Sequence, residues 1–271
     1  MNWFTIFLRG LLMGIADIIP GVSGGTIALI TGIYERLIKG ISDINKLIIK
    51  ELSRGKIKKA FTNILKLDFE LFIPLLIGIA LAFIVLSHLI SYLLEELTAY
   101  TYAFFFGLIL ASAFFVYKQS SKEKYDLVFL LIGGVFAFWF VSLNVLSSSH
   151  SLIILFFSGI IGICAMILPG ISGSFIMVLL GQYEYLINAI KVFALDKIGV
   201  FALGALIGIL SFSKLLEWLL KNYKSLTMAF LTGIMLGSLR LPFEKMILGT
   251  WPVYLIALIG FGVVFILEKY S

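Results

Sequence analysis

The stretch Pro20-Gly21-Val22-Ser23-Gly24-Gly25-Thr26, called the first motif below, interrupts a long apolar segment near the N-terminus. A second copy, Pro169-Gly170-Ile171-Ser172-Gly173-Ser174, interrupts another apolar segment and is called the second motif. At a constant offset, residues 10–38 and 159–187 are identical at 13 of 29 positions. The matches run through Pro, Gly, Ser, Tyr and Glu, which an apolar composition alone would not produce. The chain therefore contains an internal duplication.

The first motif breaks a helix. Pro20 has no N–H to donate and disfavours helical backbone before it, so a helix that begins near residue 4 should end near residue 19. The glycines permit a sharp reversal, and Ser23 and Thr26 favour the start of a second helix, expected from about Gly24 to Ile38. By the duplication, a second pair of helices is expected at 152–168 and 172–190.

Each of these half-helices has about 15 residues and spans about 22 Å, less than the roughly 30 Å of a membrane core. We therefore predict two re-entrant hairpins, residues 4–38 and 152–190, with their motifs near the membrane midplane. Irregular backbone at that depth is tolerated where protein or a polar cavity surrounds it. The free N–H groups at the start of each second half-helix would favour an anion there.

Composition places the chain in a membrane. Of its 271 residues, 61% are hydrophobic and 13% charged, with a mean hydropathy of +1.10, which excludes an ordinary soluble domain and favours an all-α polytopic membrane protein. One cysteine, Cys164, cannot form an intramolecular disulfide and is expected to be a packing residue. We expect no metal site, no cofactor and no nucleic-acid partner, because none of their motifs is present. The N-terminus, Met1 to Ile19, is expected to be mature structure rather than a signal peptide.

The chain divides into two repeats, residues 1–147 and 148–271. Each is predicted to hold a hairpin and three transmembrane helices, at 70–93, 100–117 and 127–146 in the first repeat, and at 198–220, 226–240 and 251–268 in the second. The repeats also match outside the hairpins, where Thr101, Gly107 and Gly134 fall on Thr227, Gly233 and Gly260. Because a hairpin makes no net crossing, three spans place the second repeat on the opposite side, which gives inverted-topology repeats.

The distribution of basic residues predicts that the N- and C-termini both lie in the cytoplasm, because basic residues are enriched on the cytoplasmic side of membrane proteins. The inner side would hold Arg9, Arg36, Lys39, Lys46, Lys50, Arg54, Lys56, Lys58, Lys59, Lys66, Lys118, Lys122, Lys124, Lys221, Lys224 and Lys269; the outer side would hold only Lys191, Lys197, Arg240 and Lys245. Within residues 39–68, apolar side chains such as Ile41, Ile44 and Leu47 recur at helical spacing. This predicts a basic amphipathic helix on a membrane face, with a solvated cytoplasmic loop as the alternative.

Both motifs carry a family resemblance. The residues from Gly14 to Thr26, followed by Gly32-Ile33-Tyr34-Glu35, resemble the signature of a bacterial membrane family once called a domain of unknown function and now described as undecaprenyl-phosphate (polyprenyl-phosphate) transporters. Met166 to Ser174, followed by Gly181-Gln182-Tyr183-Glu184, resembles the family's second signature. The resemblance covers essentially the whole chain. It implies a multi-pass protein of the bacterial cytoplasmic membrane that returns the lipid carrier to the inner leaflet for cell-wall synthesis.

The obstacle to flipping such a lipid is its phosphate, because burying that charge unpaired in hydrocarbon is costly, whereas the tail can stay in lipid. We assign phosphate contact to backbone N–H and hydroxyl groups of the two motifs. The residues are Ser23, Gly24, Gly25, Thr26, Ser172, Gly173 and Ser174. The alternative is that the glycines only allow close helix packing.

Four charged residues are further candidates. Asp17 precedes the first motif where the second copy has Met166, and it is expected to couple transport to a proton or cation, or to form a structural ion pair. Glu35 and Glu184, in the duplicated Tyr-Glu, are gating candidates or interfacial anchors. Arg240 is expected to capture the headgroup on the outer side or to anchor that interface.

Other functions remain as alternatives. An ion-coupled secondary transporter of a small anion would use the same two motifs but needs an enclosed site, whereas a lipid needs a lateral opening. A lipid phosphatase would need a nucleophile with an acid–base pair or metal ligands, and no catalytic residues are predicted. A scaffold would not need duplicated broken helices. The expected partners are the lipid substrate and the surrounding membrane lipids, and a homodimer stays open.

Overall fold

The computed structural model describes residues 2–19, 22–44, 47, 51, 54–118, 123–143 and 150–269. These residues form helices and connecting turns, without a strand among them. In chain order the elements are α1 (Trp3–Ile18), α2 (Gly24–Ile30), α3 (Tyr34–Ile44), α5 (Ile57–Ile64), α6 (Phe69–Leu81), the π-helix η2 (Ala82–Leu86), α7 (Ser87–Glu96), α8 (Thr98–Lys118), α9 (Asp126–Val141), α10 (Leu152–Ile167), α11 (Gly173–Leu179), α12 (Tyr183–Lys191), α13 (Leu195–Asn222), α14 (Lys224–Ser238), α15 (Arg240–Met246) and α16 (Pro252–Lys269). Pro20, Gly21, Lys46, Lys50 and Lys122 lie outside the described residues.

Helix α1 ends where the sequence predicts, at Ile18, and Ser23 caps α2 by accepting a hydrogen bond from the Gly25 N–H. The prediction that the second half-helix continues to Ile38 was wrong, because α2 ends at Ile30. Gly32 has φ +72°, and the chain there makes the paired bonds of a Schellman ending, from Ile33 N–H to the Ala28 carbonyl and from Gly32 N–H to the Leu29 carbonyl. Helix α3 then begins in a new direction.

The second copy breaks in the same way, which corrects the prediction of one helix over 172–190. Helix α11 ends at Leu179, and Gly181 has φ +65°. The Gln182 N–H bonds to the Met177 carbonyl, as Ile33 bonds to Ala28 in the first copy. Each half-helix after a motif is therefore only two turns long, and a duplicated glycine causes both breaks.

Among the described residues, four apolar segments are long enough to cross a membrane, at Phe69–Leu86, Thr98–Lys118, Leu195–Asn222 and Lys224–Met246. The predicted spans at 127–146 and 251–268 overlap the shorter apolar helices α9 and α16, and residues 144–146 lie outside the described residues. The bounds of the six spans stay predictions. The chain is thus a polytopic all-helical membrane protein.

Helices that correspond between the two halves make corresponding contacts. Helix α1 packs on α6 as α10 packs on α13, and α8 packs on α16 as α9 packs on α14. Glycines allow these close approaches: a Cβ on Gly107 would collide with the Ala257 carbonyl, and one on Gly233 would collide with the Leu130 carbonyl. Small residues at such contacts are the usual basis of helix packing in membranes.

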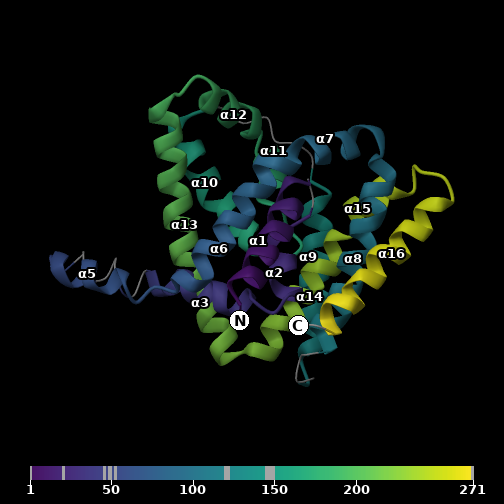
Figure 1. The fold of residues 1–271 in the computed structure, drawn as a ribbon, viewed down its shortest axis with the longest axis horizontal. Helices are drawn as coiled ribbons and strands as arrows, with labels where there is room; N and C mark the ends of the chain where they lie inside the picture. Colours follow the sequence, from purple (N-terminus) through teal and green to yellow (C-terminus); the bar gives the residue numbers. More distant parts are fainter. Residues whose placement is uncertain are drawn as a thin grey trace.

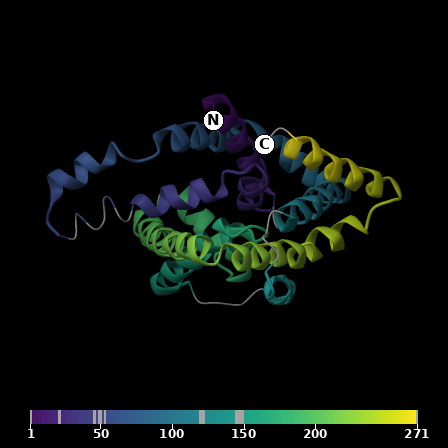
Figure 2. The ribbon, with the colours of Figure 1, turned by 90° about the horizontal axis from the view of Figure 1, so that it is seen from below.

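Figure 1 marks the two chain ends in the lower half of the view, N near α3 and C near α14, whereas α7 and α12 lie at the top. Figure 2 shows α3 running beside α13, in agreement with their contacts. The exposed parts of the helices are largely apolar, as expected of surfaces that face lipid.

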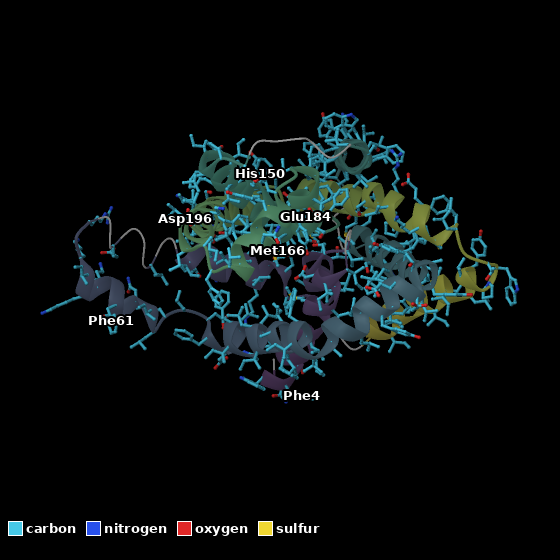
Figure 3. All side chains as sticks on the ribbon, turned by 90° about the horizontal axis from the view of Figure 1, so that it is seen from above. Phe4, Phe61, His150, Met166, Glu184 and Asp196 are labelled. Carbon is cyan, nitrogen blue, oxygen red and sulfur yellow. The ribbon has the colours of Figure 1, made fainter. Side chains whose placement is uncertain are left out.

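The basic segment 39–68 only partly follows its prediction. Ile41 lies on α3 and is buried in the protein, and α3 packs on α13, so this part of the segment does not present an apolar face to the membrane. Helix α5 instead extends away from the other helices and carries exposed Ile57 and Phe61 one turn apart (Figure 3). An interfacial position for α5 stays a prediction.

Candidate functional site

The two motifs, far apart in the sequence, contact each other directly. The Gly170 N–H donates to the Thr26 hydroxyl oxygen at 2.8 Å, and the Ser23 hydroxyl donates to the Leu168 carbonyl at 3.1 Å. Ser23 and Thr26 are fully buried. Glycine is required at position 25 because a Cβ there would lie 2.7 Å from the Ile167 carbonyl oxygen. The hydroxyls of the first motif therefore satisfy backbone groups around the second motif.

Asp17 occupies the start of α2. One of its carboxylate oxygens accepts a hydrogen bond of 2.7 Å from the Gly24 N–H. Gly24 permits this approach, because a Cβ would lie 2.5 Å from the other carboxylate oxygen. A carboxylate at the N-terminus of a helix is favoured by the unpaired N–H groups there. Asp17 thus holds the place at the first motif that an external anion would take.

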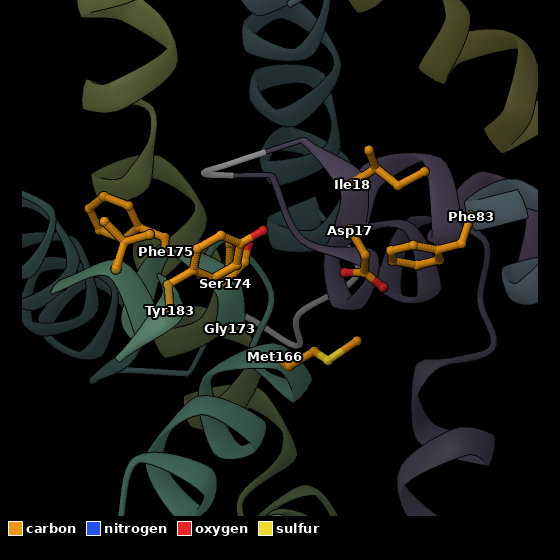
Figure 4. Close-up of a pocket in the computed structure, with 10 residues that line it drawn as sticks. Asp17, Ile18, Phe83, Met166, Gly173, Ser174, Phe175 and Tyr183 are labelled. Atoms are coloured by element: carbon orange, nitrogen blue, oxygen red, sulfur yellow. The ribbon is translucent and has the colours of Figure 1, made fainter. Parts of the chain in front are cut away.

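A pocket of about 500 Å³ opens beside the second motif. It lies between the end of α1 and the start of α11 (Figure 4). Its lining combines hydroxyl groups and one carboxylate with apolar side chains: Asp17, Ile18, Phe83, Met166, Ser172, Gly173, Ser174, Phe175, Val178 and Tyr183. The volume is in the range of small-molecule sites.

The second motif presents its polar groups to this pocket. The hydroxyls of Ser172 and Ser174 lie 2.8 Å apart and hydrogen-bond to each other, and Ser172 does not cap α11 through its side chain. Met166 stands where the first copy has Asp17, so no carboxylate precedes α11 at the corresponding position. The two copies therefore differ. The polar groups of the first motif are hydrogen-bonded within the protein, whereas those of the second motif line a pocket.

The predicted phosphate contacts therefore separate into two groups. Ser172, Gly173 and Ser174 line the pocket together with Asp17. Ser23, Gly24, Gly25 and Thr26 are buried in the contact between the motifs and do not line this pocket.

Arg240 lies outside this pocket, at the junction of α14 and α15. Its guanidinium pairs with Glu244 at 2.7 Å, donates to the Ser142 hydroxyl and sits 4.7 Å from the centre of the Phe138 ring. These contacts tie α15 to the end of α9. Its roles in headgroup capture and as an anchor of the outer interface both stay predictions.

The two gating candidates lie at equivalent places in the fold. Glu35 is in the first turn of α3 and pairs with Lys224 on α14 at 2.7 Å, while Glu184 is exposed in the first turn of α12. Both carboxylates are suited to the N-terminal ends of their helices. Neither lines the pocket beside the second motif.

Six of the residues that line the pocket were not predicted from the sequence: Ile18, Phe83, Met166, Phe175, Val178 and Tyr183. Tyr183 belongs to the duplicated Tyr-Glu, of which only the glutamate was proposed from the sequence as a functional residue, but the tyrosine lines the pocket. Its equivalent, Tyr34, is buried. Phe83 comes from the π-helix that interrupts the α6 span, and π-helical turns are frequent at functional sites. Met166 could have been found from its alignment with Asp17.

The pocket combines hydroxyl groups with an apolar lining at the junction of two broken helices, and the described residues contain no cluster of three or more His, Cys, Asp or Glu side chains. Residues 13–252 match the model of a family described as undecaprenyl phosphate translocase-like. The chain belongs to this family. No solved structure matches it.

Two curated relatives agree with the family. A polyprenyl-phosphate transporter of Vibrio cholerae is 44% identical over 240 residues, covering 88% of this chain and 77% of the relative. A polyprenyl-phosphate transporter of Staphylococcus aureus is 34% identical over 261 residues, covering 88% of this chain and 85% of the relative. The family and these relatives are named as transporters rather than enzymes. This family member is accordingly a multi-pass bacterial membrane protein of a polyprenyl-phosphate transporter family.

Proposed function

We propose that this protein moves undecaprenyl phosphate from the outer to the cytoplasmic leaflet, so that the lipid carrier can be reused in cell-wall synthesis. The observation that carries the proposal is the pocket where Ser172, Ser174 and Tyr183 gather beside the junction of the two motifs. A site of this kind supplies hydrogen-bond donors to a phosphate within an apolar bundle. The names of the family and of its relatives supply the substrate class.

The two halves act, in this proposal, as inverted repeats built on re-entrant hairpins. Support comes from the corresponding contacts of α1 with α6 and α10 with α13, and from the two chain ends, which lie in the same half of the view (Figure 1). Movement between two arrangements of such repeats would open the junction to each leaflet in turn. The N- and C-termini would both face the cytoplasm.

The phosphate would rest against Ser172, Gly173 and Ser174, with Tyr183 as a further donor. In the opposite arrangement, breaking the hydrogen bonds of Ser23 and Thr26 with the second motif would free the hydroxyls of the first motif to take over. The substrate then passes between two equivalent sets of donors, which keeps its charge hydrogen-bonded throughout the crossing.

Asp17 would couple this movement to a proton. Its carboxylate lines the same pocket as the serines, so a phosphate with a charge of about −1.5 to −2 would be repelled by an ionised Asp17. Protonation of Asp17 removes that repulsion and weakens its hold on the Gly24 N–H. Tyr183 is the other titratable group that lines the pocket.

The test is the outer-leaflet level of undecaprenyl phosphate in cells depleted of this protein and of redundant transporters, read with a surface probe that binds lipid phosphate. We expect depletion to raise the level and the wild type to restore it, but not Ser172→Ala/Ser174→Ala. Ser211→Ala is the matched control, because that hydroxyl bonds to a carbonyl of its own helix. An unchanged level on depletion would refute lipid transport and favour transport of a small anion.

A further inference from the structure

A second pocket, of about 410 Å³, adjoins the polar one and has an almost wholly apolar lining. It lies between two groups of helices, α1, α3 and α6 on one side and α10 and α13 on the other. Asp17 and Met166 line both pockets, so the two spaces meet at this pair. Figure 4 shows the Asp17 carboxylate and the Met166 side chain at the same end of the polar pocket, away from Tyr183 and Phe175.

The second pocket also reaches the outer surface of the bundle. Leu76 on α6 and Leu206 on α13 line it and are more than half exposed, and neighbouring exposed side chains on the same helices, such as Ile77 and Leu203, are apolar. Its inner end is formed by buried side chains such as Leu75 and Leu210. The second pocket therefore opens to the surface between α6 and α13, and at its inner end it shares Asp17 and Met166 with the pocket that the serines of the second motif line.

We propose that this apolar pocket, here called the isoprenoid groove, binds the first isoprene units of the substrate, next to its phosphate. The chemistry of the two spaces matches the two ends of one molecule: hydroxyl donors for the phosphate and apolar side chains for the tail. The groove is too small for the whole chain, so the remaining units extend through the opening between α6 and α13 into lipid. This inference rests on the proposed function and adds the part of the lipid that the protein recognises.

The physical role of the groove is to orient the substrate. Inside a bilayer the tail gains no hydrophobic free energy by leaving lipid, because lipid is equally apolar. What the groove contributes is packing that aligns the first units, which directs the phosphate past Asp17 and Met166 toward Ser172. A small anion has no tail and would therefore not bind in the isoprenoid groove.

The experiment uses the full chain in detergent and measures the binding of two probes, inorganic phosphate and farnesyl phosphate. Leu206→Trp narrows the groove at its mouth. Leu203→Trp is the matched control, because Leu203 lies on the same helix, does not line the groove and is 53% exposed against 52% for Leu206. Leu76→Trp narrows the groove from the opposite side and repeats the test should Leu206→Trp fail to fold.

We expect Leu206→Trp and Leu76→Trp to bind farnesyl phosphate about tenfold more weakly than Leu203→Trp, which is about 1.4 kcal/mol of binding free energy, because the narrowed groove no longer packs against the first isoprene units. Binding of inorganic phosphate should stay unchanged in all three. Equal affinity of the variants and the control for farnesyl phosphate would overturn the groove. A wild type that binds neither probe, or a Ser172→Ala/Ser174→Ala variant that binds both normally, would instead refute the phosphate site of the proposed function.

A photoreactive farnesyl phosphate with its reactive group on the second isoprene unit gives an independent measurement on the wild type. Crosslinks should map to residues of the groove on α6 and α13, such as Leu76 and Ile209. Crosslinks confined to lipid-facing positions outside the groove, such as Leu203, would contradict the proposal.

Discussion

The contact between the two motifs can be tested at one atom by replacing Thr26 with valine. The two side chains have nearly the same shape, and Thr26 is fully buried, so the change removes the hydroxyl without opening a cavity. The lost interaction is the 2.8 Å hydrogen bond that the Thr26 oxygen accepts from the Gly170 N–H. The substitution leaves that N–H buried without its partner.

The expected cost is that of one buried unsatisfied donor, about 1–3 kcal/mol. For a chain of this size, each kcal/mol lowers the melting temperature by about 2–4 °C, so Tm should fall by roughly 2–12 °C. Hydrogen exchange reports the same change locally, since an opening free energy lower by about 1–3 kcal/mol speeds exchange of the Gly170 amide by roughly 5- to 150-fold.

Thr232→Val is the control. Thr232 is equally buried, but its hydroxyl donates to the Met228 carbonyl of its own helix, which keeps its backbone hydrogen bond after the substitution. We expect a smaller effect there. If Thr26→Val leaves both Tm and Gly170 exchange at wild-type values, the two motifs are not held together by this bond, and the description of the site is wrong.

Three further predictions concern other parts of the fold. Gly32→Ala should lower Tm in a thermal melt, because φ +72° costs a residue with a Cβ about 1–2 kcal/mol. Gly199→Ala is the control and should not lower Tm, because Gly199 lies in a helix with open space around the added Cβ. Equal Tm values for the two variants would show that Gly32 is not needed to end α2. Asp17→Asn should preserve the fold and abolish the pH dependence of transport in proteoliposomes, and a retained pH dependence would exclude Asp17 as the coupling group. Hydrogen bonds from Arg36 lower the pKa of Asp68, so this pair stabilises the fold above the ordinary pKa of an aspartate, and the stabilisation is lost as the pH falls through the lowered value. Melts between pH 7 and 3 should show a smaller loss for Asp68→Asn than for wild type, by a modest amount because solvent screens this pair; identical profiles would contradict it.

The difference between the two copies of the motif bears on how the protein works. The first copy carries Asp17, which bonds to the start of α2, and the second carries Met166, which leaves the start of α11 facing the pocket. The Asp17/Met166 pair thus contributes to a chemical difference between the duplicated halves, because only the first copy has a carboxylate before its motif.

Much of the fold was predictable because it depends on neighbouring residues. The end of α1 before Pro20, the Ser23 cap of α2 and the four helical segments long and apolar enough to cross a membrane follow from local backbone chemistry and from runs of apolar side chains. The breaks at Gly32 and Gly181 were also local, and they were missed because a single glycine inside an apolar run can equally continue a helix.

The amino-acid sequence by itself determined the class of protein, its helices, its duplication and the family to which it belongs, since these depend on composition and on the order of residues along the chain. Only the tertiary structure decided which polar groups are available. Ser23 and Ser172 are equivalent in sequence, yet one is bound to Leu168 and the other lines a pocket. The physical reason is that a hydroxyl group bonds to whichever partner the fold brings within about 3 Å. Those partners come from the other half of the chain.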